Sequence, residues 1–402
     1  MKKIKIPLVI LSERGFFIEF ICPICKNKDP RYIGFKNGKP YCRRCISFMG
    51  EKADKNDDCL HLIDSEAIIK YPLSKEQIRI SEEVKENYIN GFNTLIYAVC
   101  GAGKTELVFK VIEYALKNAY QVGFAIPRKD VVIELAVRLQ KTFIKNKVVS
   151  VYGGNTSNLV GDIIVLTTHQ LYRYERYFDL LILDEIDAFP YKDNPVLINL
   201  FKRSVKKNYV LMSATPSPSV IEEFSSPNHK IVTLYTRYHM KPIPVPRIVL
   251  SYGFAKYIFI SKKLKEYQKL NKPCFLFVAT IDECEEVFKI ISKFVPNGNR
   301  VHSQVKGRNK IITEFRSGKY KYLVTTAVLE RGVTLKNLQV IIFNADHSIY
   351  NSSALIQISG RVGRVKDAPE GEVIFLANKK TNDMEEAINK TKEANKHLQE
   401  LL

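Results

Sequence analysis

The sequence predicts an α/β protein with two tandem parallel-sheet domains that follow a small cysteine-bearing module. Three observations support this class. Short continuous apolar runs alternate with amphipathic helical patterns over two stretches of the 402 residues, as in parallel sheets that are buried on both faces. A segment with three prolines, 240–249, separates these stretches, and two Cys-x-x-Cys pairs precede them. The expected domains are 1–65, 66–240 and 241–402.

The first module is predicted to be a zinc ribbon. Sixteen residues separate its two Cys-x-x-Cys pairs, and two such pairs can complete a tetrahedral zinc site. The residues between them alternate like a β-hairpin with a turn at Asn37-Gly38. Two disulfides or a redox dithiol are alternatives, which a reducing compartment disfavours. The expected ligands of a structural Zn²⁺ are Cys22, Cys25, Cys42 and Cys45.

The surface of this ribbon allows two interpretations. It carries four basic residues and three aromatic residues, Lys36, Lys39, Arg43, Arg44, Tyr32, Phe35 and Tyr41. Cations interleaved with aromatic rings form a platform for nucleic acid, but the same residues are also compatible with an ordinary solvated face. Cys59 with His61 is a weak candidate for spare ligands, and Cys100 and Cys274 are expected to be small core residues.

Charge and hydropathy restrict the class of protein. The formal net charge of +20 indicates a polyanionic partner, with nucleic acid ahead of an acidic membrane surface; a generally lysine-rich proteome is the plainer alternative. Hydrophobic residues make up 46% of the chain, which argues against wholesale disorder. The apolar run 6–11 is too short for a signal peptide, and no run approaches the roughly 20 apolar residues that span a bilayer. We therefore expect a cytoplasmic protein with reduced cysteines.

The two long stretches each predict a series of strands and helices. In the first stretch the expected strands are 95–100, 122–126, 148–151, 163–166, 180–183 and 209–212, with helices over 105–119 and 129–144. In the second stretch they are 274–278, 299–302, 321–325, 339–343 and 372–376. The helix formers in 381–402 predict a terminal helix.

The stretch "AVCGAGKTE", residues 98–106, predicts a phosphate-binding loop, because it follows an apolar strand and opens a helix. Backbone N–H groups of such a loop face the phosphates, its lysine neutralises the β/γ oxygens, and its threonine can ligate Mg²⁺. Ala98 stands where the motif usually has its first glycine. The residues expected to bind ATP are Gly101, Ala102, Gly103, Lys104, Thr105 and Glu106.

The run "FDLLILDEIDAF" supplies carboxylates at the end of an apolar strand. Asp184 is expected to hold Mg²⁺ together with Thr105, and Glu185 to orient or deprotonate the attacking water. A solvated strand end is the alternative, and the combination with the preceding phosphate-binding loop disfavours it.

Further segments follow in a recognisable order. They are "YPLSKEQ", "IPRKDVVIEL", "VYGG", "TTHQL", "LDEID", "MSATPS", "FLFVAT", "VHS", "FRSGKYKYLVTTAVLERGVTL" and "QISGRVGR". This order resembles that of superfamily 2 helicases over about residues 70–378, which implies two RecA-like lobes that share an ATP site. A four-cysteine cluster ahead of the helicase core resembles the ComFA family of late-competence ATPases more than PriA-type or RecG-type helicases.

The resemblance implies roles for further residues. Gln77 matches the adenine-contacting glutamine, Ser213 and Thr215 match the motif that couples hydrolysis to motion, and Gln357, Arg361 and Arg364 match the second lobe's contribution to catalysis. An arginine that reaches the γ-phosphate on closure ties hydrolysis to closure. The residues that match strand-binding motifs are Pro127, Arg128, Gly153, Gly154, Thr167, Thr168, His169, His302, Ser303, Thr325 and Thr326.

The resemblance implies an ATP-driven translocase that pulls single-stranded transforming DNA into the cytosol, with weak or no duplex unwinding. The alternatives are a restart, repair or RNA helicase, and an ATP-gated adaptor that clamps DNA without moving along it. The implied partners are single-stranded DNA, a phosphoribosyltransferase-like competence protein and a membrane DNA channel; homo-oligomer formation stays open. The expected location is the cytoplasm, including the inner face of the membrane.

Overall fold

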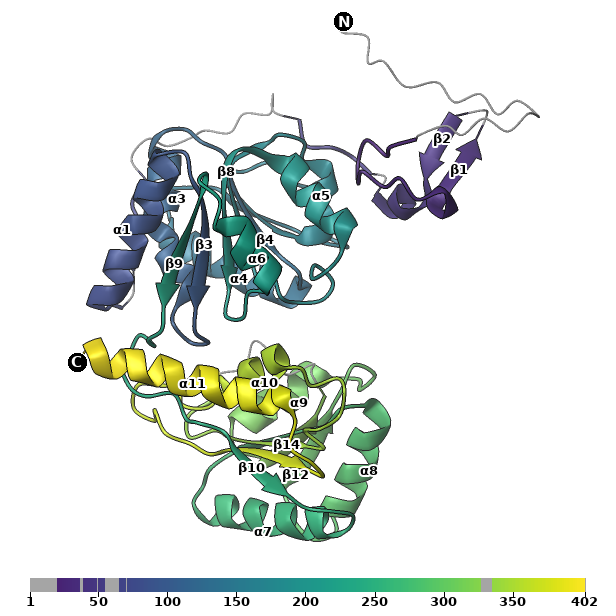
Figure 1. Ribbon diagram of the computed structural model, residues 1–402, viewed down its shortest axis with the longest axis vertical. Helices are drawn as coiled ribbons and strands as arrows, with labels where there is room; N and C mark the ends of the chain where they lie inside the picture. Colours follow the sequence, from purple (N-terminus) through teal and green to yellow (C-terminus); the bar gives the residue numbers. More distant parts are fainter. Residues whose placement is uncertain are drawn as a thin grey trace, which may run out of the picture. The chain divides into compact units, whose positions relative to one another are not determined.

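The computed structural model describes residues 20–36, 39–48, 50–54, 65–69, 71–326 and 335–401. The signal-like start, the predicted turn at Asn37-Gly38 and the pair Cys59 and His61 lie outside these residues. Contacts divide the chain into two compact units (Figure 1). The first unit is Met1–Pro72, Arg79–Ile96 and Leu107–Val232, and the second is Leu73–Ile78, Tyr97–Glu106 and Thr233–Leu402.

The first large sheet has seven strands in the order β5-β6-β4-β7-β8-β3-β9, and its neighbours from β5 to β8 are parallel. The strands are β3 Asn93–Ala98, β4 Val122–Ile126, β5 Val148–Val151, β6 Ile163–Thr167, β7 Phe178–Asp184, β8 Val205–Ser213 and β9 His229–Leu234. The associated helices are α1 Lys75–Ile89, α2 Lys104–Leu107, α3 Phe109–Lys117, α4 Lys129–Thr142, η3 Thr168–Arg173, α5 Pro195–Ser204 and α6 Pro218–Phe224.

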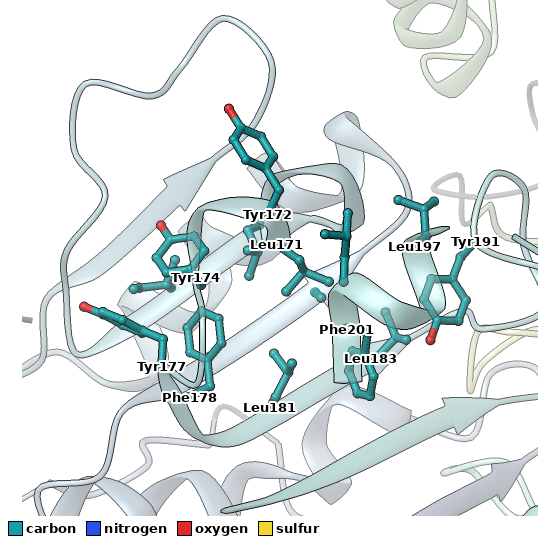
Figure 2. Packing of buried hydrophobic residues seen from close by; sticks show 14 of the residues in the cluster. Leu171, Tyr172, Tyr174, Tyr177, Phe178, Leu181, Leu183, Tyr191, Leu197 and Phe201 are labelled. Atoms are coloured by element: carbon teal, nitrogen blue, oxygen red, sulfur yellow. The ribbon is translucent and has the colours of Figure 1, made fainter. Parts of the chain in front are cut away.

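An aromatic cluster fixes the end of η3 in the first unit. Tyr174, Tyr177 and Phe178 pack with ring centroids 5.0–5.2 Å apart, and the Tyr174 hydroxyl donates to the Leu159 carbonyl oxygen at 2.9 Å. Figure 2 shows these rings beside Leu171, which is fully buried in the same core. Because aromatic packing of this kind is rigid, the short helix that follows β6 is held firmly in place.

The second sheet has six strands in the order β10-β15-β14-β11-β13-β12, and all neighbours are parallel. The strands are β10 Arg247–Leu250, β11 Cys274–Phe277, β12 Gly298–Val301, β13 Tyr322–Thr325, β14 Gln339–Phe343 and β15 Val373–Ala377. The helices are α7 Ala255–Lys269, α8 Ile281–Ile291, α9 Arg308–Arg316, α10 Ser352–Ser359 and α11 Asn382–Leu401.

This second sheet is covered on both faces, and β11 shows how. Phe275 and Phe277 share a core with residues of α10 and α11, whereas Cys274 and Leu276 share another core with residues of α7 and α8. Alternate residues of a strand point to opposite faces, so the continuous apolar run "CFLF" serves two helical layers. The predicted parallel-sheet α/β class is confirmed in both sheets.

The cysteine module forms a small hairpin. It consists of η1 Pro30–Tyr32, β1 Ile33–Lys36, β2 Lys39–Cys42 and η2 Arg43–Phe48, with β1 and β2 antiparallel. Its cysteines belong to the same hydrophobic core as Tyr172 and Leu197 of the first unit. Asn199 of α5 donates from Nδ2 to the Cys25 carbonyl oxygen at 2.9 Å. The module is therefore packed on η3 and α5.

Every predicted strand overlaps an observed one, but two of the strands in the described residues, β9 and β10, were missed. Strand β10 begins directly after Pro246, within the three-proline segment 240–249 that was expected to separate the two stretches. Proline cannot donate to a strand ladder and is tolerated at edges, and β10 is an edge strand. Strand β9, another edge strand, has two buried residues, Val232 and Leu234, and lacks the continuous apolar run of the central strands. In the part of the chain that the structure describes, no helix is long and apolar enough to span a bilayer.

Candidate nucleotide and nucleic-acid site

The predicted phosphate-binding loop follows β3 and leads into α2. Gly101 and Gly103 have φ values of +84° and +79°, which glycine adopts without steric cost. The Ala102 N–H donates to the Val99 carbonyl oxygen at 3.1 Å, and the Lys104 ammonium donates to the Ala98 carbonyl oxygen at 3.4 Å. This backbone has the tight turn that an anion-binding loop requires. Cys100 lies in this loop and is only half-buried, so its prediction as a core residue was wrong.

Gln77 lies against this loop. Its Nε2 donates to the Ala102 carbonyl oxygen at 2.8 Å, its Oε1 accepts from the Ser74 N–H at 2.9 Å, and its side chain is buried. A Cβ on Gly103 would approach Gln77 Nε2 to 2.6 Å, and the φ of +79° at this position would strain any other residue. Contact with adenine stays a prediction, but Gln77 is placed at the loop that the prediction requires.

The residues predicted to hold Mg²⁺ and to orient the attacking water, Asp184 and Glu185, lie at the carboxyl end of β7. Asp184 is the last residue of the strand, and its Oδ1 accepts from the Glu185 N–H at 2.8 Å. Glu185 has a φ of +61°, a conformation that is uncommon outside glycine and is found at functional turns. The turn therefore gives the two neighbouring carboxylates a fixed geometry.

Asp187 joins this turn to the end of β8 and was missed. Its Oδ1 accepts from Ser213 Oγ at 3.0 Å, and its Oδ2 accepts from Thr215 Oγ1 at 2.8 Å. The two donors are the residues predicted to couple hydrolysis to motion, and both are buried. The signal was present in the sequence, since Asp187 is the last letter of "DEID". A single carboxylate thus connects two predicted motifs.

The strand-binding residues of the first unit lie at one edge of the sheet. Pro127-Arg128 follow β4, Gly153-Gly154 follow β5, and Thr167 ends β6 before Thr168-His169. These strands and β7 are parallel neighbours, so their carboxyl ends share this edge with Asp184. Lys129 reinforces the edge by donating from Nζ to the Gly153 carbonyl oxygen at 3.3 Å. Ligands of open parallel sheets bind at such edges.

The second unit places its strand-binding residues in the same way. His302-Ser303 follow β12, and Thr325-Thr326 lie at the end of its parallel neighbour β13. His302 is buried and contacts Glu285 Oε1 through Nε2 at 2.8 Å, while Ser303 is exposed. Thr325 Oγ1 donates to the Thr326 carbonyl oxygen at 3.0 Å. Ser303 is therefore the more accessible of the two residues that follow β12.

The predicted catalytic arginines follow α10. Gln357 and Arg361 are buried, and Arg364 donates from Nε to the Gly360 carbonyl oxygen at 2.7 Å. A Cβ on Gly360 would lie 2.4 Å from the Cβ of Cys100, and a Cβ on Gly101 would lie 3.6 Å from Arg364 Cγ. Within the second unit, residues 360–364, the glycine-arginine segment, are thus in close contact with the phosphate-binding loop.

The four cysteines have the arrangement of a metal site. All four are buried, and their Sγ atoms lie within 4.8 Å of one another. The Cys22–Cys45 and Cys25–Cys42 Sγ distances are 3.7 and 3.6 Å. Four sulfur atoms at the usual zinc–sulfur bond length span tetrahedral edges of about 3.8 Å, and disulfides require about 2.05 Å. The thiols therefore fit a tetrahedral ion and are not disulfide-bonded.

Comparison with known proteins agrees with this arrangement. The family described as DEAD/DEAH box helicase matches residues 78–224, and the helicase conserved C-terminal domain matches residues 255–366. Competence protein ComFA of Bacillus subtilis is 34% identical over 395 residues, covering 93% of this chain and 85% of that protein. The chain belongs to the ComFA family.

A second ComFA relative, from Streptococcus pneumoniae, is 33% identical and covers 89% of this chain and 86% of its own length. Dbp5 of S. cerevisiae, in a structure with RNA and ADP BeF3, has the same fold, with a TM-score of 0.59 and 15% identity over 82% of this chain and 93% of that one. This ComFA protein is a competence-related, superfamily 2 helicase-like enzyme that uses ATP and Mg²⁺.

Proposed function

We propose that this ComFA protein is an ATP-driven translocase that pulls single-stranded transforming DNA into the cytosol. One observation carries the proposal: each of the two sheets has an edge lined by the residues of the strand-binding motifs. Hydroxyls, glycine N–H groups and a cation suit phosphate contacts and carry little base specificity. If both edges bound the phosphates of one DNA strand and ATP turnover moved one edge relative to the other, the DNA strand would advance.

The chemistry divides among the predicted residues. Lys104 neutralises the terminal phosphates, Thr105 and Asp184 hold Mg²⁺, and Glu185 orients the water. Arg361 and Arg364 stabilise the charge that develops on the γ-phosphate. Gln357 supports them from the preceding helix. The Asp187 carboxylate accepts hydrogen bonds from Ser213 and Thr215 and lies in the turn that begins with Asp184. A change at this turn during hydrolysis would therefore be passed to the strand-binding edge.

We further propose that the four cysteines hold a structural Zn²⁺. The buried thiols and their spacing support this, because a site whose four positions are filled by protein has no open position for catalysis. Metal analysis of the protein purified without added zinc is expected to give one Zn²⁺ per chain. A Cys42→Ser variant should lose it.

Nucleic-acid-stimulated ATP hydrolysis tests the function. Single-stranded DNA should stimulate turnover more than duplex DNA or RNA, and Lys104→Ala should abolish the stimulated rate. Stronger stimulation by RNA would support an RNA helicase, and efficient unwinding of a blunt duplex would support a repair-type helicase. Stimulation of ATP hydrolysis without movement along the DNA would support the ATP-gated adaptor that clamps DNA. Co-purification with a phosphoribosyltransferase-like competence protein and a membrane DNA channel would place the enzyme at the site of uptake.

A further inference from the structure

Arg237 is a buried cation in the segment that enters the second unit after β9. Arg237 is 1% exposed, and among the residues that the structure describes its guanidinium bonds to backbone carbonyl oxygens and to no carboxylate. Burying a charge without a counter-ion is costly unless hydrogen bonds replace water. The buried guanidinium of Arg237 must therefore be stabilised by hydrogen bonds as well as by packing.

Backbone carbonyl groups take the place of the counter-ion. Nη1 donates to the carbonyl oxygens of Val362 at 2.6 Å and Gly363 at 2.7 Å, and Nη2 donates to that of Gly360 at 3.2 Å. Nε donates to the carbonyl oxygen of Cys100 at 3.1 Å. Three of these acceptors belong to the glycine-arginine segment, and the fourth belongs to the phosphate-binding loop. One guanidinium thus connects both segments.

The residues after Arg237 hold the same segment. His239 donates from Nε2 to the Gly363 carbonyl oxygen at 2.9 Å, and the Tyr238 hydroxyl accepts from the Lys366 N–H at 3.1 Å. Gly363 has a φ of +69°, which glycine adopts without steric cost, and a Cβ there would lie 2.1 Å from the Pro369 carbonyl oxygen. Burial and the nearby Arg364 lower the pKa of Arg237 to about 10, which leaves the guanidinium charged at neutral pH.

We propose that Arg237 is a positioning residue for ATP turnover: its guanidinium fixes the backbone of 360–363 against the phosphate-binding loop and so sets the positions of Arg361 and Arg364. Lysine cannot replace it, because a compact ammonium lacks the planar fork of five N–H donors. The proposal rests on the proposed roles of Arg361 and Arg364 in hydrolysis.

Steady-state kinetics of the full chain with saturating single-stranded DNA tests this role. Arg237→Lys should lower kcat roughly 10- to 100-fold, as expected when a catalytic group is displaced by about 1 Å. The KM for ATP should change by less than about threefold, because the loss falls on the transition state. Arg247→Lys is the matched control, since Arg247 forms an exposed ion pair with Glu372 in the same unit. It should keep the kcat of the unaltered protein.

Chemical rescue separates positioning from a folding defect. Millimolar guanidinium chloride should raise the kcat of Arg237→Gly, and sodium chloride at equal ionic strength should not. An unchanged kcat in Arg237→Lys would overturn the proposal, as would a loss that follows the unfolding temperature without rescue. Arg361→Ala distinguishes a failure of the proposed catalytic role of Arg361 from a failure of the positioning role of Arg237. Normal kcat in Arg361→Ala would refute the proposed role of that arginine itself, whereas a defect there with normal Arg237→Lys would refute only the positioning role.

Discussion

The Phe48 ring of the cysteine module stacks on His169, with ring centroids 6.2 Å apart and planes inclined by 26°. His169 directly follows Thr167-Thr168, so the module touches a predicted strand-binding motif. Two hydrogen bonds to backbone carbonyl oxygens reinforce the junction: the Arg173 side chain donates from Nη1 to Glu51 at 2.5 Å, and the Ala53 N–H donates to Arg173 at 3.1 Å. The cysteine module thus supports the short helix η3, which begins at Thr168 of that motif.

Replacing Phe48 by alanine should loosen this junction. We expect the affinity for single-stranded DNA to fall, together with about 1–3 kcal/mol of stability for a partly buried aromatic ring. Fluorescence anisotropy with a labelled oligonucleotide measures the affinity, and urea unfolding measures the stability. Phe294→Ala, at a ring of the second unit that is 48% exposed and belongs to none of the predicted binding motifs, is the control for the loss of an exposed ring. Equal affinity in Phe48→Ala and the unaltered protein would show that the junction has no part in binding.

Removing the metal should lower the stability and the DNA affinity more than the Phe48→Ala substitution does. The four thiols lie in the same core as residues of η3 and α5, and metal binding to such modules contributes directly to folding. A strong chelator should release one Zn²⁺ per chain, lower the unfolding temperature and weaken DNA binding. Restored zinc should reverse these changes. A protein whose unfolding temperature is insensitive to chelation would contradict a structural zinc site.

Asp187→Ala should uncouple hydrolysis from DNA. The hydroxyls of Ser213 and Thr215 lose their shared acceptor, and an unsatisfied buried group costs about 1–3 kcal/mol. We expect ATP to bind normally while the stimulation of turnover by single-stranded DNA falls. Asp187→Asn keeps one acceptor oxygen and should retain part of the stimulation. Full stimulation in Asp187→Ala would rule out the bridge as the coupling element.

His239 predicts a dependence of stability on pH. Burial lowers the pKa of its imidazole, and Nδ1 accepts from the Lys241 N–H at 3.2 Å, which requires a free lone pair. The unfolded chain therefore takes up a proton before the folded chain does, so the contribution is present above the unfolded pKa of about 6.5 and is lost as the pH falls through the folded pKa.

The pH effect is measured as the free energy of unfolding in urea at about pH 7.5 and about pH 5.5, on either side of the ordinary histidine pKa. The unaltered protein should lose more stability on acidification than His239→Gln, whose amide can still donate to Gly363. His169 and the other histidines are common to both proteins and cancel in the difference. Equal losses would mean that His239 is not held neutral.

Local sequence patterns predicted most of the fold because central parallel strands carry continuous apolar runs. The edge strands β9 and β10 were missed, because β9 begins with the polar residues His229 and Lys230 and has no continuous apolar run, and β10 follows prolines. Motifs on loops that follow strands, such as Asp184-Glu185, could be predicted because the apolar run directly before them marks the end of a strand. The contacts of Arg237 with Gly360–Gly363 and of Phe48 with His169 join residues separated by more than a hundred positions. No local pattern marks such pairs, and a lone arginine gives no sign that carbonyl groups surround it.

Displacement of streptavidin from end-biotinylated single-stranded DNA tests translocation most directly. With ATP, the protein should displace streptavidin from one end of the oligonucleotide faster than from the other, and Lys104→Ala should displace it from neither. Tight, ATP-dependent DNA binding and full ATPase stimulation without displacement from either end would contradict translocation and indicate a clamp.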